Sequence, residues 1–284
     1  MGRGGLVLVS TPIGNLGDVT NRALTALREA DLVLCEDTRT TQRLLSALGL
    51  SARLEALHEY NEEARVPGLV ERLRQGGRIA LVSDAGTPLV SDPGFRLVRA
   101  AIAAGVPVTA APGPNAAITA LTLSGLPPLP FLFLGFLPPR QAARRAALGN
   151  LRAAELAGLS ATLIWHEAPH RLAEMLVDVL AVMGDRPAAV ARELTKRFEE
   201  VRRGALSELA AHYAGAQARG EISVLLGPPA PNITGVDDLD TALRAALAGH
   251  SLKDAAALVA AATGLPRKQV YARALEIGRM PPPT

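Results

Sequence analysis

Through the first 125 residues, short apolar runs alternate with segments whose apolar positions recur at helical spacing. The apolar runs predict strands at residues 6–9, 32–35, 79–83 and 108–110. The segments between them predict helices at residues 21–29, 41–48, 62–75 and 95–104. Strands that are apolar throughout and separated by helices are typical of a parallel sheet covered on both faces. We therefore expect an N-terminal α/β domain over residues 1–118.

A stretch rich in proline at residues 125–130 interrupts this pattern and is expected to be a linker. Further strands are then predicted at residues 131–134, 161–165, 188–191 and 222–226, and helices at residues 141–154, 171–183 and 207–218. Residues 192–203 have the pattern of a polar strand or hairpin, so this sheet is expected to be partly antiparallel. The second α/β domain is expected over residues 119–228.

The prolines of residues 228–231 mark another linker, after which three helical patterns cover residues 239–248, 252–262 and 267–277. A turn is expected at residues 264–266, because Gly and Pro stand together there. This spacing fits either a helix-turn-helix or a helical cap on the second domain. We expect residues 232–284 to form this separate helical segment.

Composition limits the cellular setting and the partners. Cys35 is the only cysteine, so no internal disulfide forms, and its place at the end of an apolar run predicts a packed side chain. No apolar run is long enough for a signal peptide or a membrane span, so a cytoplasmic protein with no membrane partner is expected. The net charge is +3 and the isoelectric point 9.4, with nearly all basic residues arginine. That bias fits nucleic-acid binding and a GC-rich coding sequence equally well.

Three loops follow the predicted strands at residues 6–9, 79–83 and 108–110, and each combines Gly with Pro. The carboxyl ends of parallel strands are where such sheets bind ligands, and these loops suit a small ligand held largely by main chain. Nucleotide-binding P-loops, dinucleotide fingerprints and zinc-ligand spacings are absent from the sequence, and no metal is expected.

The loops contain STPIGNLGD from Ser10, SDAGTPLVSDPG from Ser83 and PGPNAAITAL from Pro112, with CEDTR from Cys35 between the first two. WHEAPHR, RELTKRFEEV and GEISVLL follow in order. This ordered set resembles the ribosomal small-subunit methyltransferase I family, the 16S rRNA (cytidine 2′-O)-methyltransferases, within the tetrapyrrole-methylase superfamily. The resemblance runs essentially from end to end of the chain.

The resemblance implies two α/β domains with S-adenosylmethionine in a cleft between them. It also implies methylation of a cytidine ribose 2′-oxygen in the decoding region of 16S rRNA, on the small ribosomal subunit, by a homodimer. In the superfamily an acidic residue commonly precedes the proline of the middle loop. Here Thr87 stands there, with Asp84 three residues earlier, which matches the rRNA branch.

The three loops and the resemblance together predict the site. The expected cofactor-binding residues are Pro12, Asp84, Gly86, Thr87, Pro88, Val90, Pro114, Asn115 and Ala116. A ribose hydroxyl is a weak nucleophile that a base or a nearby charge would help, and the catalytic candidates are Glu36, Asp37, Arg39, Asp92 and Glu167. Glu193, His166 and His170 are alternatives, while Asp37 and Thr38 also suit a helix cap.

Contacts to RNA would need arginine or lysine near the cleft or on the terminal helices; the candidates are Arg140, Arg144, Arg145, Arg197, Arg202, Arg203, Arg267, Lys268 and Arg273. Two other functions stay open from the sequence. One is a small-molecule methylase of the tetrapyrrole type, against which the basic tail and the SDAGTP loop count. The other is a ligand-sensing, DNA-binding regulator without enzymatic activity.

Overall fold

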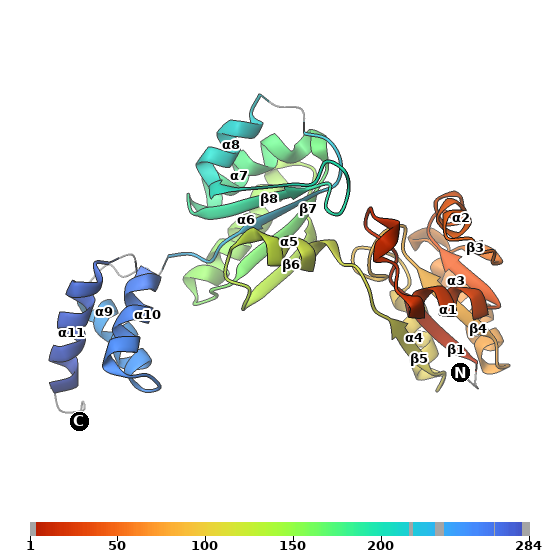
Figure 1. Ribbon diagram of the computed structural model, residues 1–284, viewed down its shortest axis with the longest axis horizontal. Coiled ribbons are helices and arrows are strands. Elements are labelled where there is room, and N and C mark those ends of the chain that lie inside the picture. The colour runs from red at the N-terminus through yellow and green to blue at the C-terminus, as the bar shows by residue number, and fades with distance from the viewer. Residues whose placement is uncertain (1–3, 216–217, 231–235, 264, 280–284) are drawn as a thin grey trace. The chain divides into compact units, whose positions relative to one another are not determined.

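The computed structural model describes residues 4–215, 218–230, 236–263 and 265–279. Backbone contacts divide the chain into two units. One comprises Met1–Ala154 with Thr162–Gly227 and contains two five-stranded sheets; the other comprises Glu155–Ala161 with Pro228–Thr284. Figure 1 shows their helices and strands, and the α/β fold class expected from the sequence is confirmed.

The first sheet is parallel throughout, with strand order β3-β2-β4-β1-β5. Its strands are β1 (Gly5–Val9), β2 (Leu32–Cys35), β3 (Leu54–Ala56), β4 (Arg78–Val82) and β5 (Val108–Ala111). The four predicted strands are confirmed to within one residue at each end, and β3 is additional. Val9 pairs with Val82 on one side and with Ala111 on the other. The three loops singled out in the sequence therefore begin side by side.

Two helices cover each face of this sheet. One face carries α1 (Asn21–Glu29) and α2 (Thr38–Ala47), and the other carries α3 (Glu59–Arg74) and α4 (Phe95–Ala103). Helix α2 begins three residues before the expected start because Asp37 caps it, accepting a hydrogen bond from the Arg39 amide at 2.8 Å. Helix α3 likewise begins early, where the His58 amide donates to Asn61 Oδ1 at 2.9 Å.

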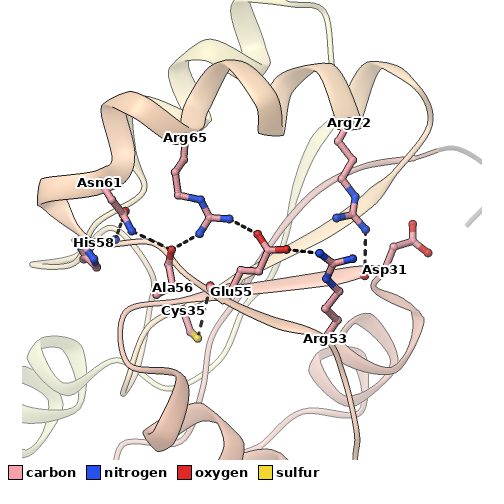
Figure 2. Close-up of polar contacts among 9 residues, drawn as sticks. All are labelled: Asp31, Cys35, Arg53, Glu55, Ala56, His58, Asn61, Arg65 and Arg72. Atoms are coloured by element: carbon pink, nitrogen blue, oxygen red, sulfur yellow. Dashed lines mark hydrogen bonds and ion pairs between the residues drawn. The ribbon is translucent and has the colours of Figure 1, made fainter.

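The short edge strand β3 is held by side chains of α3 (Figure 2). Arg65 donates to the Ala56 carbonyl and forms an ion pair with Glu55. Asn61 Nδ2 donates to the same carbonyl at 3.2 Å, and Arg53 donates to Glu55 at 2.9 Å. These contacts are made by polar side chains outside the strand, so the apolar pattern of β3 itself does not mark it as a strand.

The second sheet is mixed, with strand order β6-β7-β10-β8-β9. Its strands are β6 (Phe131–Phe136), β7 (Thr162–Glu167), β8 (Pro187–Arg192), β9 (Glu200–Ala205) and β10 (Ile222–Leu226). Strands β6 and β7 are parallel, whereas β10 is antiparallel to β7 and β8, and β8 and β9 pair as a hairpin. The expectation of a partly antiparallel sheet is confirmed.

One face of the second sheet is covered by α6 (Gln141–Leu156), α7 (Leu172–Met183) and α8 (Leu206–Tyr213), around the buried Trp165. The other face is covered by α5 (Ala116–Ser124), whose Ala120 and Leu121 pack with Ile164 and Leu225. The sequence pattern predicts no helix there, and residue 118 lies inside α5. Residues 125–130 connect this helix to β6.

A buried ion pair joins α6 to α7. Arg144 and Asp178 are both fully buried, and Arg144 Nη2 lies 2.6 Å from Asp178 Oδ2. Burial raises the pKa of Asp178, but hydrogen bonds from Arg145 and Arg144 outweigh burial and leave that pKa below its ordinary value. Arg144 is therefore a structural residue, and the expectation that it contacts RNA is wrong.

Replacing Arg144 by Met is expected to lower the free energy of unfolding by about 3 kcal/mol, because the change removes both contacts of a fully buried guanidinium with the buried carboxylate of Asp178. Arg145→Met is the matched control. Its side chain is 48% exposed, so its pair with Asp178 contributes at most about 1 kcal/mol. Urea denaturation followed by the fluorescence of Trp165, the only tryptophan, measures both variants. Equal losses would contradict the structural assignment.

The second unit contains α9 (Val236–Leu247), α10 (Leu252–Thr263) and α11 (Arg267–Arg279), which confirms the three expected terminal helices. They share an apolar core that includes Leu243 and Val270. Arg273 holds α11 to α9 by donating twice to Asp240, at 2.6 and 2.7 Å. Gly264 of the expected turn lies outside the described residues. In the described ranges, every helix is too short or too polar to cross a membrane.

Candidate active site

Hydrogen bonds join the three loops that follow β1, β4 and β5. Thr11 and Gly86 exchange backbone hydrogen bonds of 2.8 and 3.1 Å. The Thr87 hydroxyl donates to the Pro114 carbonyl at 3.1 Å, and Asn115 Nδ2 donates to Thr87 Oγ1 at 3.3 Å. Thr87, which stands where the superfamily commonly has an acidic residue, therefore connects the loop after β4 to the loop after β5.

The loop after β4 has an unusual backbone. Gly86 has a φ of +80°, and a Cβ added there would lie 3.2 Å from Ile13 Cγ2. Leu89 and Ser91 have φ values of 72° and 69°, which are unfavourable for residues with side chains. Such strain persists only where surrounding contacts enforce it, and it concentrates at ligand sites.

A cavity of about 420 Å³ lies beside these loops, a size in the range of small-molecule sites. The structure brings seven of the predicted site residues to its wall: Gly86, Thr87, Val90, Asp92, Asn115, Ala116 and Glu167. The wall also includes residues from the loop after β1, from the second sheet and from the segments next to its strands. Helix α5 begins at Ala116, which lines the cavity. The cavity therefore lies at a helix N-terminus, where backbone amides have no partner within the helix.

The other predicted residues do not line the cavity. They are Pro12, Glu36, Asp37, Arg39, Asp84, Pro88 and Pro114. Asp37 caps α2, as the alternative interpretation proposed, and Arg39 is 84% exposed. Asp84 Oδ1 accepts from the Asp37 amide at 3.3 Å, so it supports the CEDTR turn. Position at a strand end thus predicted the correct edge of the sheet, but not the direction of each side chain.

Asp92 lies in the loop after β4, on the wall of the cavity. Burial raises its pKa to about 6, helped by the negative charges of Glu36 and Asp84. A carboxylate with a pKa of about 6 is ionised at neutral pH but close enough to neutrality to exchange a proton. Asp92 is therefore suited to act as a general base at the wall of the cavity.

Glu167, at the end of β7, is almost fully buried. It accepts from the Ala168 amide at 2.7 Å, and Arg171 Nη2 lies 3.2 Å from its Oε2. Burial raises its pKa against the opposing effects of that amide and of Arg171. Arg171 also donates to the Leu137 carbonyl at 2.7 Å. Glu167 and Arg171 therefore fix the ends of β6 and β7 beside the cavity.

Sequence reasoning missed most of the wall from the second sheet. His166 was only an alternative, yet it lines the cavity, with its Nδ1 3.1 Å from Ser223 Oγ. Burial lowers the pKa of His166, so its ring is neutral at pH 7. Ser223 faces His166 because β10 and β7 pair in that register. The motifs WHEAPHR and GEISVLL were a signal for both residues, but their pairing follows only from the sheet. In the described ranges, no group of three or more His, Cys, Asp or Glu could hold a metal ion.

Comparison with known proteins identifies the family. Residues 5–210 match the family described as tetrapyrrole (corrin/porphyrin) methylases, and residues 234–278 match the RsmI C-terminal HTH domain. A Micromonospora olivasterospora protein is 50% identical over 95% of this chain and 86% of its own length. An Escherichia coli O157:H7 protein is 44% identical over 96% of each chain. Both are named ribosomal RNA small subunit methyltransferase I. The chain belongs to this family.

Membership of the methyltransferase I family confirms the predicted activity class, methyl transfer, and the predicted cofactor, S-adenosylmethionine. It also excludes a regulator without enzymatic activity. The match of the terminal helices to an HTH domain favours a helix-turn-helix over a helical cap.

Solved structures agree on the fold of this methyltransferase. The methyltransferase CobJ has a TM-score of 0.58 at 19% identity, over 82% of this chain and 97% of CobJ. Diphthine synthase has a TM-score of 0.60 at 18% identity, over 78% of this chain and 90% of its own. At these identities the likeness concerns the fold alone.

The residues of the cavity fit S-adenosylmethionine. Gly86 leaves open a space that a side chain would fill, and Ile13, Val90 and Leu194 offer apolar surface. Asp92 provides a negative charge, which complements the positive sulfonium of this cofactor. The chemistry of these groups therefore agrees with the cofactor that the family uses.

Proposed function

We propose that this enzyme methylates the 2′-oxygen of a cytidine ribose in the decoding region of 16S rRNA, on the small ribosomal subunit. The names of relatives at 44–50% identity support ribosomal RNA as the substrate. The terminal helices support it too, since they match a domain described for this family. The tetrapyrrole-type alternative has the family match of residues 5–210 in its favour, but relatives at 44–50% identity over most of the chain are named for ribosomal RNA.

The cavity beside α5 is the proposed cofactor site, with Gly86, Thr87, Val90, Asn115 and Ala116 as the residues that hold it. S-adenosylmethionine, when bound, would supply a methyl group bonded to a positively charged sulfur, and this sulfur would be the leaving group when an oxygen attacks the methyl carbon. The enzyme's own residues align the hydroxyl, exclude water and accept its proton.

The observation that carries the proposal is Asp92, a carboxylate on the cavity wall with a pKa of about 6. We assign it as the general base that takes the proton of the ribose hydroxyl. Glu167 is a poorer base because Arg171 engages it and because it is almost fully buried. His166 is neutral and half-buried against Ser223, and we assign it to shaping the cavity.

The single cysteine supports a ribose oxygen over a base carbon as the acceptor. Base methylation at a ring carbon often uses a cysteine nucleophile. Cys35 is fully buried in β2, with Sγ 3.9 Å from the Glu55 carbonyl, and burial raises the pKa of its thiol. A buried neutral thiol is a poor nucleophile, so Cys35 does not serve that chemistry.

Purified enzyme, labelled cofactor and small ribosomal subunits test the reaction. A methylated 2′-oxygen cannot attack the adjacent phosphate, so one RNA linkage should become resistant to alkali. Mass mapping should place it at a cytidine of the decoding region. Label that travels with the free base after acid hydrolysis would show that the acceptor is wrong, although the cofactor assignment would stand.

Removal of residues 232–284 is expected to weaken RNA binding while cofactor binding stays unchanged. Arg267 and Lys268 are exposed at the start of α11 and can contact phosphate, whereas Arg273 is engaged by Asp240. Affinity for RNA should fall steeply with salt in the full chain and less steeply in the truncated one. The double variant Arg267→Gln/Lys268→Gln should reduce the salt slope in part. Identical slopes in all three proteins would rule out an RNA contact by these helices.

We further propose that the enzyme acts in the cytoplasm as a homodimer. Its substrate is assembled there, and the family resemblance supports a twofold assembly. Sedimentation equilibrium at micromolar concentration tests the dimer. A monomer across the accessible concentration range would overturn it.

A further inference from the structure

The segment between β8 and β9, residues 193–199, is a rigid turn. Glu193 and Thr195 both have positive φ, at 51° and 66°. The Lys196 amide donates to the Glu193 carbonyl at 3.0 Å, and the Glu199 amide donates to the Lys196 carbonyl at 3.1 Å. The Glu199 carboxylate accepts in turn from the Thr195 amide at 2.7 Å. The two strained residues are therefore held by bonds within the turn itself.

This turn lies at the cavity. Leu194 is buried and lines the cavity wall. Lys196 crosses over Gly14, in the loop after β1, where an added Cβ would collide with the lysine side chain. Its Nζ lies 2.9 Å from Glu193 Oε1 and 3.2 Å from Glu221 Oε2, and Glu221 also lines the cavity. The turn thus has one side chain in the cavity wall, and another that contacts Gly14 and pairs with a second residue of that wall, Glu221.

At its tip the turn presents Phe198 to solvent. The side chain is 65% exposed, in a chain with only five phenylalanines. The Arg197 guanidinium carbon lies 5.5 Å from the centre of the Phe198 ring. The ring and the guanidinium are both exposed on this turn, so they are accessible to a molecule that binds beside the cavity.

We propose that Phe198 and Arg197 form a stacking platform for an unpaired nucleobase next to the nucleotide that enters the cavity. This inference rests on the proposed function, since it requires an RNA substrate. Single-stranded RNA is bound mainly by stacking of bases on aromatic rings and guanidinium planes, with arginine also neutralising phosphate. A rigid turn suits this role because little conformational freedom is lost on binding.

Direct binding tests the platform. Full-length enzyme is titrated into a fluorescent single-stranded RNA that carries the decoding-region sequence, and separately into small ribosomal subunits. Phe198→Ala is expected to weaken binding to both by about 5- to 100-fold, the range for loss of one stacked base. Phe198→Trp, which keeps a ring, should restore affinity. The affinity for S-adenosylmethionine, measured by calorimetry, should not change in either variant.

Ile102→Ala is the matched control. Ile102 is 62% exposed, an exposed fraction similar to that of Phe198. It lies near the carboxyl end of α4, which leads to the amino edge of the parallel sheet, opposite the edge that carries the cavity. This control should bind RNA as the wild type does. Arg197→Met should lower affinity and reduce the salt slope by about one phosphate contact.

The outcomes separate this inference from the proposed function. Wild-type RNA affinity in Phe198→Ala would overturn the platform while leaving 2′-O-methylation intact. Weakened binding to subunits with unchanged binding to RNA would show that the ring contacts a ribosomal protein, which also overturns it. If a base is methylated, while Phe198→Ala loses RNA affinity and Phe198→Trp restores it, the proposed reaction is wrong but the platform stands.

Discussion

Replacing Asp92 by Asn is expected to lower the rate of methyl transfer by about 100- to 10,000-fold, the usual contribution of a positioned general base. Asn has nearly the same shape but cannot accept the proton of a hydroxyl at neutral pH. In the wild type, the rate should rise with pH through about 6, because Asp92 becomes a carboxylate above its pKa. The Asn variant should lack that rise.

Single-turnover rates between pH 5 and 8, with small subunits as substrate, measure this effect. Glu36→Gln is the informative control, because the charge of Glu36 contributes to the raised pKa of Asp92, yet Glu36 does not line the cavity. This control should keep its activity at pH 8 and move the rise to lower pH. Activity lost in Glu36→Gln and retained in Asp92→Asn would reverse the assignment.

Asp92→Asn should also be more stable toward unfolding than the wild type at neutral pH. The pKa of Asp92 is about 6 in the folded protein, against a usual value of 3.8. Folding therefore favours the protonated form, and Asp92 opposes folding increasingly as pH rises from about 4 to 6. Above pH 6 the cost is at most about 3 kcal/mol, because solvent screening reduces it for a partly exposed carboxylate, and Asn removes this cost. Urea denaturation should show the gain at pH 7 and almost none below pH 4. No gain at pH 7 would mean that Asp92 is not destabilised by its site.

The fold was predictable wherever an element carries its own pattern. Strands β2 and β4 are buried along almost their whole length, so each is an apolar run that stands out from the helices. Leu6 and Val9 of β1 are fully buried as well. Helix α5 has apolar residues on nearly all of its sides, so it lacks the alternation of apolar and polar positions that marks a helix. Because it follows the turn-forming residues PGPN, the sequence pattern did not separate it from the loop. Strand β3 depends on Arg65 and Asn61 of α3, which its own three residues cannot indicate.

Part of the candidate site was likewise predictable from the sequence and part was not. Loops after parallel strands are predictable, because Gly and Pro mark them and topology brings strand ends together. The direction in which a side chain points cannot be predicted from the loop sequence. Asp92 lines the cavity, for example, whereas Glu36 and Asp37 do not. The wall from the second sheet depends on strand register, as the pairing of His166 with Ser223 shows. Register is fixed by packing of the whole sheet, so no local motif contains it.

Ala116→Phe is expected to abolish measurable binding of S-adenosylmethionine, an affinity loss of 100-fold or more. Ala116 is the first residue of α5 and lines the cavity, so a ring at this position would protrude into the space proposed for the cofactor. The change leaves Asn115 to cap the helix, through its hydrogen bond to the Ile118 amide at 3.1 Å. The fold should therefore persist, with Trp165 fluorescence and the urea midpoint close to those of the wild type.

Gly86→Val tests the same cavity from the loop after β4. Any side chain there approaches Ile13 and must adopt a φ of +80°, so this variant should lose both cofactor binding and some stability. Thr122→Phe is the matched control for Ala116→Phe, because Thr122 lies on the same helix but is exposed and outside the cavity wall. Calorimetry should give wild-type affinity for this control and no heat of binding for the two cavity variants. If Ala116→Phe and Gly86→Val both bind the cofactor undiminished, the cofactor does not occupy this cavity. The assignment of Asp92 as the base would then lose its ground as well, because its role depends on the methyl donor being held beside it.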